Sequence, residues 1–197
     1  MNPVIYLTGA PATGKSTLCR NLRRAVPTTA VFAYSEELRA HVARRAGLTY
    51  LTEDEIRRQS AQLVTREDVD VVDCKLVDFV AQHRTAQPIV IDSHAVTKEG
   101  YGFRVTPFKQ AELRAVSPDV ILCLYLASDK VTARIEADPM GRPLLSSFEL
   151  DLHTHLQASM AVQYGLMLDK PVYLLDSSVG AAALVDVALK RSGLSST

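Results

Sequence analysis

The stretch Val4-Ile5-Tyr6-Leu7-Thr8-Gly9-Ala10-Pro11-Ala12-Thr13-Gly14-Lys15-Ser16-Thr17 decides the fold. It begins as an apolar run typical of a buried strand, passes through a glycine-bounded turn and continues as a helix. The spacing Gly9-x-x-x-x-Gly14-Lys15-Ser16 fits the phosphate-binding P-loop, or Walker A motif. Gly9 and Gly14 permit backbone angles that other residues avoid, so that successive N–H groups can point at phosphate oxygens.

The residues that follow the turn have matching chemistry. Lys15 can reach the β- and γ-phosphates of a nucleotide, and the Ser16 hydroxyl can ligate Mg²⁺. The helix directs its positive N-terminal end toward the same anion. A purely structural glycine turn is the alternative, but strand and helix flank the motif as a nucleotide site requires. We expect contact with a nucleoside triphosphate from Gly9, Ala10, Pro11, Ala12, Thr13, Gly14, Lys15, Ser16 and Thr17.

Length and composition bound the class of protein. The 197 residues suit one domain, residues 1–197, with a single core. Charge is balanced, with 22 basic and 22 acidic residues, which argues against binding bulk nucleic acid through a charged face. Three scattered cysteines, Cys19, Cys74 and Cys123, predict free thiols in a reducing cytoplasm. No run approaches the roughly 18 apolar residues of a membrane span, so we expect a cytoplasmic protein without a membrane partner.

Five short apolar runs alternate with helical patterns along the chain. Such alternation predicts a five-stranded parallel sheet with helices on both faces. Together with the P-loop and the arginine-bearing loop described below, it favours an α/β P-loop NTPase kinase fold with a small lid. The predicted strands are 4–8, 30–34, 88–92, 120–126 and 172–176.

The segment of about 35–83 is expected to form helices on the side of the acceptor, the molecule that would receive a phosphoryl group. Ser35 is a predicted helix cap. Thr52 and Glu55 have capping-box spacing before a polar helix that carries Arg57. A further helix opens at Thr65, and its apolar residues recur at helical spacing. These helices could cover a bound acceptor or only shield the sheet.

The third predicted strand ends in a carboxylate, Asp92. Ligands of open parallel sheets lie at the carboxyl ends of strands, so Asp92 and His94 should face the site. The segment 97–105 lacks clear periodicity and is predicted to be a long functional loop. Thr106-Pro107 predicts the start of the next helix.

A mobile lid is predicted over about 138–146. A helix from Ser128 to about 137 carries Arg134 and runs into a loop with two prolines, a glycine and Arg142. Arginines that close on a transferred phosphoryl group stabilise its charge, and closure excludes water. Surface ion pairing is the alternative for both arginines. His153 and His155, in the long helix that follows, are predicted to be solvated because residues two apart point to nearly opposite sides of a helix.

These residues resemble the archaeal-type adenylate kinases of the nucleoside monophosphate kinase superfamily over nearly the whole chain. The P-loop itself is shared by many families. More specific matches are Ile91-Asp92-Ser93-His94, Gly100-Tyr101, Ser117-Pro118-Asp119, Arg134, Arg142 and Gln163-Tyr164-Gly165.

The resemblance implies ATP with Mg²⁺ as phosphoryl donor and a nucleotide as acceptor. It implies Ser16 and Asp92 around the Mg²⁺ ion, and Lys15, Asp92, Arg134 and Arg142 as catalytic residues. Ser177, after the fifth strand, would lie near the donor base. The acceptor-side residues would be Ser35, Arg57, His94, Tyr101 and Arg104.

Three departures from that family leave the acceptor open. Met140 and Ala158 stand where arginines are usual, and Ser35 replaces a glycine of the acceptor pocket. Arg104 or a neighbouring subunit could substitute, and the resemblance makes a homotrimer worth testing. Two alternatives therefore remain: a kinase of another small molecule or of a nucleic-acid 5′ end, and a slow ATP-hydrolysing switch.

Overall fold

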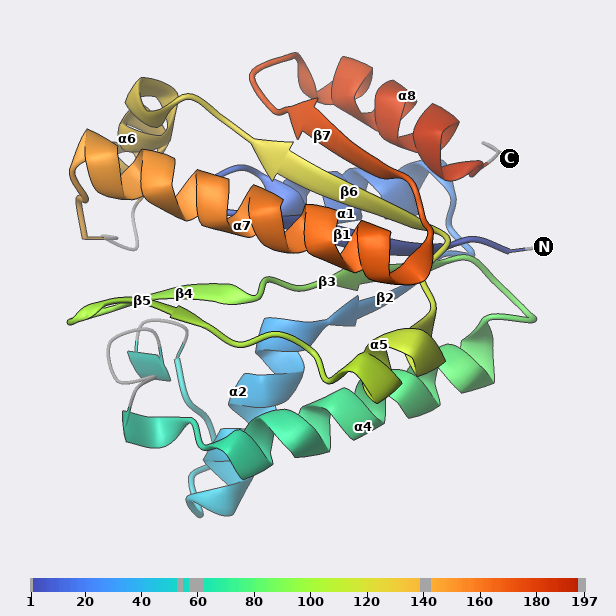
Figure 1. Cartoon of the computed structure of the whole chain (residues 1–197), viewed down its shortest axis with the longest axis horizontal. Coiled ribbons are helices and arrows are strands. Elements are labelled where there is room, and N and C mark those ends of the chain that lie inside the picture. The colour runs from blue at the N-terminus through green and yellow to red at the C-terminus, as the bar shows by residue number, and fades with distance from the viewer. Residues whose placement is uncertain (1, 53–54, 57–61, 139–142, 195–197) are drawn as a thin grey trace.

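The computed structural model describes residues 2–52, 55–56, 62–138 and 143–194. Within these residues, five strands form a parallel sheet in the order β2-β3-β1-β6-β7, with β1 in the centre (Figure 1). The strands are β1 (Val4–Gly9), β2 (Ala30–Ala33), β3 (Ile89–Asp92), β6 (Val120–Tyr125) and β7 (Val172–Asp176). The predicted α/β fold with a five-stranded parallel sheet is confirmed.

Helices cover both faces of this sheet. One face packs against α1 (Lys15–Ala25) and α8 (Ala181–Ser192), and the other against α4 (Arg66–His83), α5 (Gln110–Val116) and α7 (Ser147–Leu168). In Figure 1, α7 lies in front of the strands and α1 behind them. This layering follows from the crossover connections that parallel strands require.

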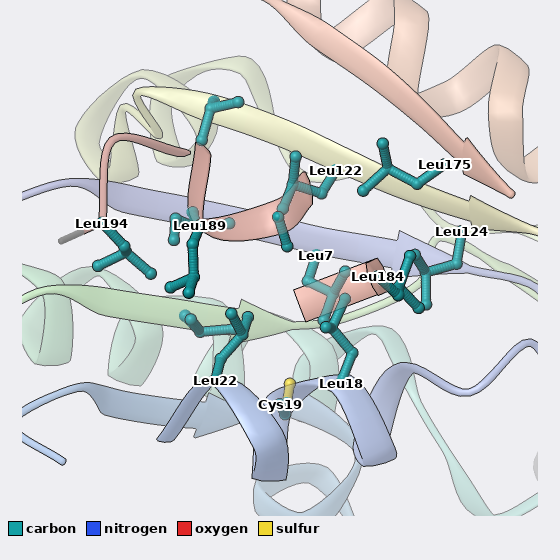
Figure 2. Packing of buried hydrophobic residues seen from close by; sticks show 14 of the residues in the cluster. Leu7, Leu18, Cys19, Leu22, Leu122, Leu124, Leu175, Leu184, Leu189 and Leu194 are labelled. Carbon is teal, nitrogen blue, oxygen red and sulfur yellow. The ribbon is translucent and has the colours of Figure 1, made fainter. Parts of the chain in front are cut away.

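Side chains of β1 point alternately to the two faces of the sheet and pack in the hydrophobic cluster on each face. Ile5 and Leu7 pack in the cluster with α1 and α8, whereas Val4 and Tyr6 pack in the cluster with α4, α5 and α7. Figure 2 shows the first cluster, with Leu7 above Leu18 of α1. These β1 residues are at most 2% exposed, and burying one such side chain contributes about 1.5–3 kcal/mol.

Side-chain caps define the starts of α4 and α7. Thr65 accepts from the Asp68 backbone N–H at the start of α4, and Ser146 caps α7 in the same way. The box between Thr52 and Glu55 is also formed. Ser35 does not cap α2 (Tyr34–Arg45): the N-cap is Ala33, two residues before Ser35, and no side chain caps this helix, so the predicted cap is wrong.

The segment predicted as a loop over 97–105 is instead a β-hairpin of β4 (Val96–Glu99) and β5 (Gly102–Val105). The two-residue turn Gly100-Tyr101 closes it, and Gly102 takes a φ of 138° that favours glycine. The hairpin projects away from the parallel sheet (Figure 1). Four residues per strand are too few to show a clear period in the sequence.

The helix predicted from Thr106-Pro107 begins later, at Gln110. The Thr106 backbone N–H donates to the Ala95 carbonyl and the Phe108 N–H donates to the Tyr164 hydroxyl. These tertiary bonds hold 106–109 outside the helix, so the prediction is wrong by about a turn. At the start of α5 the Lys109 backbone N–H donates to the Glu112 carboxylate at 3.2 Å.

Several residues of the predicted site lie outside the described residues, namely Arg57, Met140 and Arg142. The last two belong to the predicted lid, which follows α6 (Ser128–Glu136). Among the described residues, no helix combines the length and the apolar character that crossing a membrane demands.

Candidate nucleotide and acceptor site

The P-loop connects β1 to α1 in a conformation that only certain residues allow. Gly9 has a φ of 148°, and a Cβ atom there would lie 2.6 Å from the Leu124 carbonyl oxygen of β6. Ala12 and Gly14 also have positive φ, 62° and 96°. The buried Thr13 hydroxyl donates to the Ala10 carbonyl at 2.7 Å and fixes the turn. The glycine at position 9 is therefore dictated by both backbone strain and space.

Lys15 folds its side chain back over this loop. Its Nζ donates to the Gly9 carbonyl at 2.7 Å and lies 3.5 Å from the Ala10 carbonyl. Lys15 is also the first residue of α1, whose opening N–H groups have no partner within the helix. A fixed ammonium group and a helix N-terminus thus converge on one loop, which is the arrangement that binds phosphate.

Arg134 joins the P-loop to the end of β7. From α6, its Nη1 donates to the Ala12 carbonyl and its Nη2 to the Ser177 carbonyl, both at 3.0 Å. The structure thus brings together the P-loop, Arg134 and Ser177, three features predicted to share the ATP side. Ala158, at a position where the resembling family usually has an arginine, packs against the core cluster of α4, α5 and α7.

Asp92 ends β3 beside the end of β1, where the Ser93 backbone N–H donates to the Leu7 carbonyl. Burial raises the pKa of the Asp92 carboxyl, while the Lys15 charge and a hydrogen bond with Ser16 act in the opposite direction. Asp92 and Ser16 therefore form an adjacent pair of oxygen donors at the mouth of the P-loop, the donor type that Mg²⁺ prefers.

A cavity of about 180 Å³ lies next to this pair. We call it the aromatic cavity, because four of the residues lining it are Tyr6, Tyr34, Phe108 and Tyr164. Their rings meet mainly edge to face, with centroids 5.7–6.1 Å apart for Tyr6–Tyr164, Tyr34–Phe108 and Tyr6–Phe108. Such packing makes a rigid apolar wall.

Of the residues predicted to contact the acceptor, Ser35, His94 and Arg104 line the aromatic cavity. Tyr101 does not: it forms the hairpin turn with 72% of its surface exposed. The expectation that Tyr101 shares the cavity with these residues rested on a loop that is actually a hairpin. Ser35 also lines a second, more open cleft of about 790 Å³, together with Ser16 and Asp92.

Two residues that line the aromatic cavity, His94 and Asp73, have strongly shifted pKa values. Burial lowers the pKa of His94 to about 3, with the Lys15 and His153 charges acting in the same direction, so its imidazole is neutral at pH 7. Burial raises the pKa of Asp73 to about 6, although the hydrogen bond from the Tyr34 hydroxyl lowers it. Arg104 pairs with Glu99 at 3.0 Å.

Two buried residues of α7 support the site. Gln157 donates from Nε2 to the Thr8 hydroxyl on β1 and accepts from the Val96 N–H of β4 at 3.2 Å. The ring of His153 lies 3.1 Å from the Val96 carbonyl oxygen through Nε2. His153 is only 2% exposed, so its predicted solvation is wrong, because the hairpin covers this face of α7.

Sequence reasoning missed Asp73, Gln157 and His153. A signal for Asp73 was present, because it follows Val69 by four residues and precedes Leu76 by three, on the apolar stripe of α4. A carboxylate in such a stripe is unusual enough to indicate a function. Gln157 and His153 gave no comparable local signal.

Comparisons with known proteins agree with this geometry. A family model described as "AAA domain" matches residues 8–146. An adenylate kinase of Thermococcus onnurineus (strain NA1) is 23% identical over 175 residues, which cover 88% of this chain and 86% of that protein.

Solved structures share the fold at lower identity. The tunicamycin resistance protein of Deinococcus radiodurans matches with a TM-score of 0.62 at 16% identity, covering 100% of this chain and 99% of that one. Shikimate kinase from Bacteroides thetaiotaomicron matches with a TM-score of 0.58 at 15% identity, covering 95% and 97%. These matches confirm the P-loop kinase fold.

Proposed function

The chain belongs to the AAA domain family, and from that premise we propose that it transfers the γ-phosphoryl group of ATP to a nucleotide acceptor. One observation carries the proposal. Three consecutive residues, Asp92, Ser93 and His94, join the two halves of the site: Asp92 faces Lys15 and Ser16, while Ser93 and His94 line the aromatic cavity. A donor on the P-loop and an acceptor in the cavity would meet at this strand end. Similarity to an adenylate kinase supports the same reaction.

The residues present fit ATP with Mg²⁺. The P-loop has the positive-φ glycines Gly9 and Gly14 and the convergent cation of Lys15 that a triphosphate needs. Ser16 and Asp92 would hold the ion. Mg²⁺ held there would neutralise negative charge on the phosphates during transfer. An ATP-dependent role also fits the cytoplasmic location expected from the sequence.

The protein's own residues would act by binding and positioning. Lys15 would hold the transferred phosphoryl group in place, since its ammonium group is already anchored to the loop carbonyls. Arg134, fixed between the P-loop and Ser177, would supply a second positive charge on the ATP side. The predicted lid arginine, Arg142, would add a third on closure and help exclude water.

Product analysis tests the proposal. The protein is incubated with ATP, Mg²⁺ and a panel of nucleoside monophosphates, nucleosides and 5′-hydroxyl oligonucleotides, and products are followed by mass spectrometry. We expect a nucleoside diphosphate to form with an equal amount of ADP. ADP formation at the same rate with or without any acceptor would instead support a slow ATP-hydrolysing switch. A phosphorylated oligonucleotide would show that the acceptor is a nucleic-acid 5′ end and not a nucleotide.

A lysine variant links the activity to the P-loop. Lys15→Ala should lose turnover by about 10²-fold or more, because charge stabilisation in the transition state is lost, while circular dichroism stays unchanged. Lys190→Ala, exposed near the end of α8, is the matched control and should keep full activity. Wild-type turnover in Lys15→Ala would refute the phosphate-site assignment.

A further inference from the structure

Asp73 of α4 is a buried carboxylate with one oxygen unused. The residue is 1% exposed and contributes to the wall of the aromatic cavity. Its Oδ1 accepts a hydrogen bond from the Tyr34 hydroxyl at 2.7 Å. Its Oδ2 is buried and has no hydrogen-bond partner within the described part of the chain. A buried carboxylate oxygen without a donor is costly, so such a group needs an explanation.

Charged side chains around Asp73 do not supply the missing donor. Glu112 and Asp70 are acidic and raise the pKa of Asp73 further. Arg66 and Lys109 are basic, but both pair with Asp70, at 3.1 Å and 2.8 Å, and Lys109 also pairs with Glu112 at 3.7 Å. Asp73 therefore lines the aromatic cavity with an acceptor oxygen to spare, in an acidic corner.

We infer that Asp73 determines acceptor specificity by accepting a hydrogen bond on Oδ2 from a ring N–H or amino group of a nucleobase. The inference rests on the proposed function, because it treats the aromatic cavity as the site of the acceptor nucleotide. Beyond that function, the inference states that the base of the acceptor enters the cavity and that a hydrogen bond to Asp73 selects the base.

The shape of the cavity favours the base over the phosphate. Its volume of about 180 Å³ is smaller than the roughly 300–1,000 Å³ of pockets that enclose a whole drug-sized ligand, so a ring fits and a complete nucleotide does not. Tyr34 and Phe108 offer the apolar walls against which planar rings pack.

The distribution of charge orients the acceptor. The charges acting on Asp73 include those of Glu112 and Asp70, whereas the charge of Lys15 acts on His94, another residue lining the cavity. A phosphate group would be repelled at the acidic end and attracted at the end near Lys15. The base therefore points toward Asp73 and the phosphate toward the P-loop.

Three acceptors that differ at the base edge test this directly. AMP carries an amino group, GMP carries an amino group and a ring N–H, and purine riboside 5′-monophosphate carries neither. With the wild-type protein, we expect the acceptor lacking a donor to have a kcat/KM at least about tenfold below the better of the other two, since hydrogen bonds to charged groups are worth tenfold or more in affinity. Equal kcat/KM for all three would overturn the inference without variants.

Variants then assign the effect to Asp73. Asp73→Asn should raise the KM for the donor-bearing acceptor about tenfold or more, leave its KM for ATP unchanged and leave purine riboside 5′-monophosphate unaffected. Asp186→Asn, exposed on α8, is the matched control and should behave as wild type.

Three other results would each contradict either the role of Asp73 or the proposed function. A loss of kcat for all three acceptors at unchanged KM would give Asp73 a different role and overturn the inference, as would a wild-type protein that phosphorylates only non-nucleotide compounds. Wild-type protein that transfers to nothing while still binding ATP would refute the proposed function first, and the inference with it.

Discussion

Replacing Asp73 by asparagine should change how stability depends on pH. Burial raises the pKa of Asp73 from 3.8 to about 6 in the folded protein, net of the hydrogen bond from Tyr34. The folded state therefore binds the proton more tightly than the unfolded state does. For this reason the wild-type protein loses stability as pH rises through the folded-state pKa, and regains it as pH falls toward 4.

The magnitude follows from the two pKa values. At pH 8 the carboxyl is ionised in both states. At pH 5 it is about nine-tenths protonated when folded and almost fully ionised when unfolded, so the folded state gains about one pKa unit, or ~1.4 kcal/mol. Asparagine cannot titrate and lacks this gain. The difference in free energy of unfolding, variant minus wild type, should therefore be more positive at pH 8 than at pH 5 by about 1.4 kcal/mol.

Urea denaturation of both proteins at pH 5 and pH 8 measures this difference, because the titration of all other groups cancels between them. Asp176→Asn, at the end of β7, is the control. The hydrogen bond from the Ser178 backbone N–H lowers the pKa of Asp176, so its contribution is lost only as pH falls below 3.8 and its variant should show no change between pH 5 and pH 8. An equal effect of Asp73→Asn at both pH values would refute a carboxylate whose ionised form is penalised by burial.

Two further predictions concern the framework of the site. Gly9→Ala should lower ATP affinity and cost at least about 1–3 kcal/mol of stability, because alanine is strained at this φ and its Cβ meets a β6 carbonyl. Calorimetric titration measures the ATP affinity, and thermal denaturation measures the stability. Unchanged ATP binding in the variant would contradict the geometry of the loop. Gln157→Ala should cost about 1–3 kcal/mol, because it leaves the Thr8 hydroxyl and the Val96 N–H without their partner. The exposed Gln163→Ala on the same helix should cost little, and an equal loss in both variants would show that helix propensity, not these bonds, is responsible.

The sequence was most informative where structure depends on local chemistry. Three features depend on patterns within a few residues, and the structure confirms them: the P-loop glycines, the helix starts at Thr52 and Thr65, and the apolar strands. The same local logic places Asp92 at the end of a strand beside Lys15. For such features, short-range patterns and the rules of parallel sheets suffice.

Predictions failed where distant contacts override local patterns. The hairpin of β4 and β5 is held at its base by Gln157 and His153 of α7, 57 to 61 residues away along the chain. The start of α5 is delayed by bonds from 106–109 to Ala95 and Tyr164. No periodicity within these segments reports such partners, so a loop and an early helix were the natural expectations.

At Asp73, a local sequence pattern and a tertiary environment both indicate a function. In the sequence it is one polar residue within an apolar stripe, and in the structure it is a carboxylate that destabilises the fold at neutral pH. Replacing such a group by an uncharged one would remove the penalty, so stability alone does not account for it. A donor from the acceptor would offset the penalty only in the bound state, which makes an energetically unfavourable residue useful for selecting a base. The stability and specificity measurements on Asp73→Asn therefore test one idea: a variant that gains stability at pH 8 relative to pH 5 should also lose discrimination at the base edge.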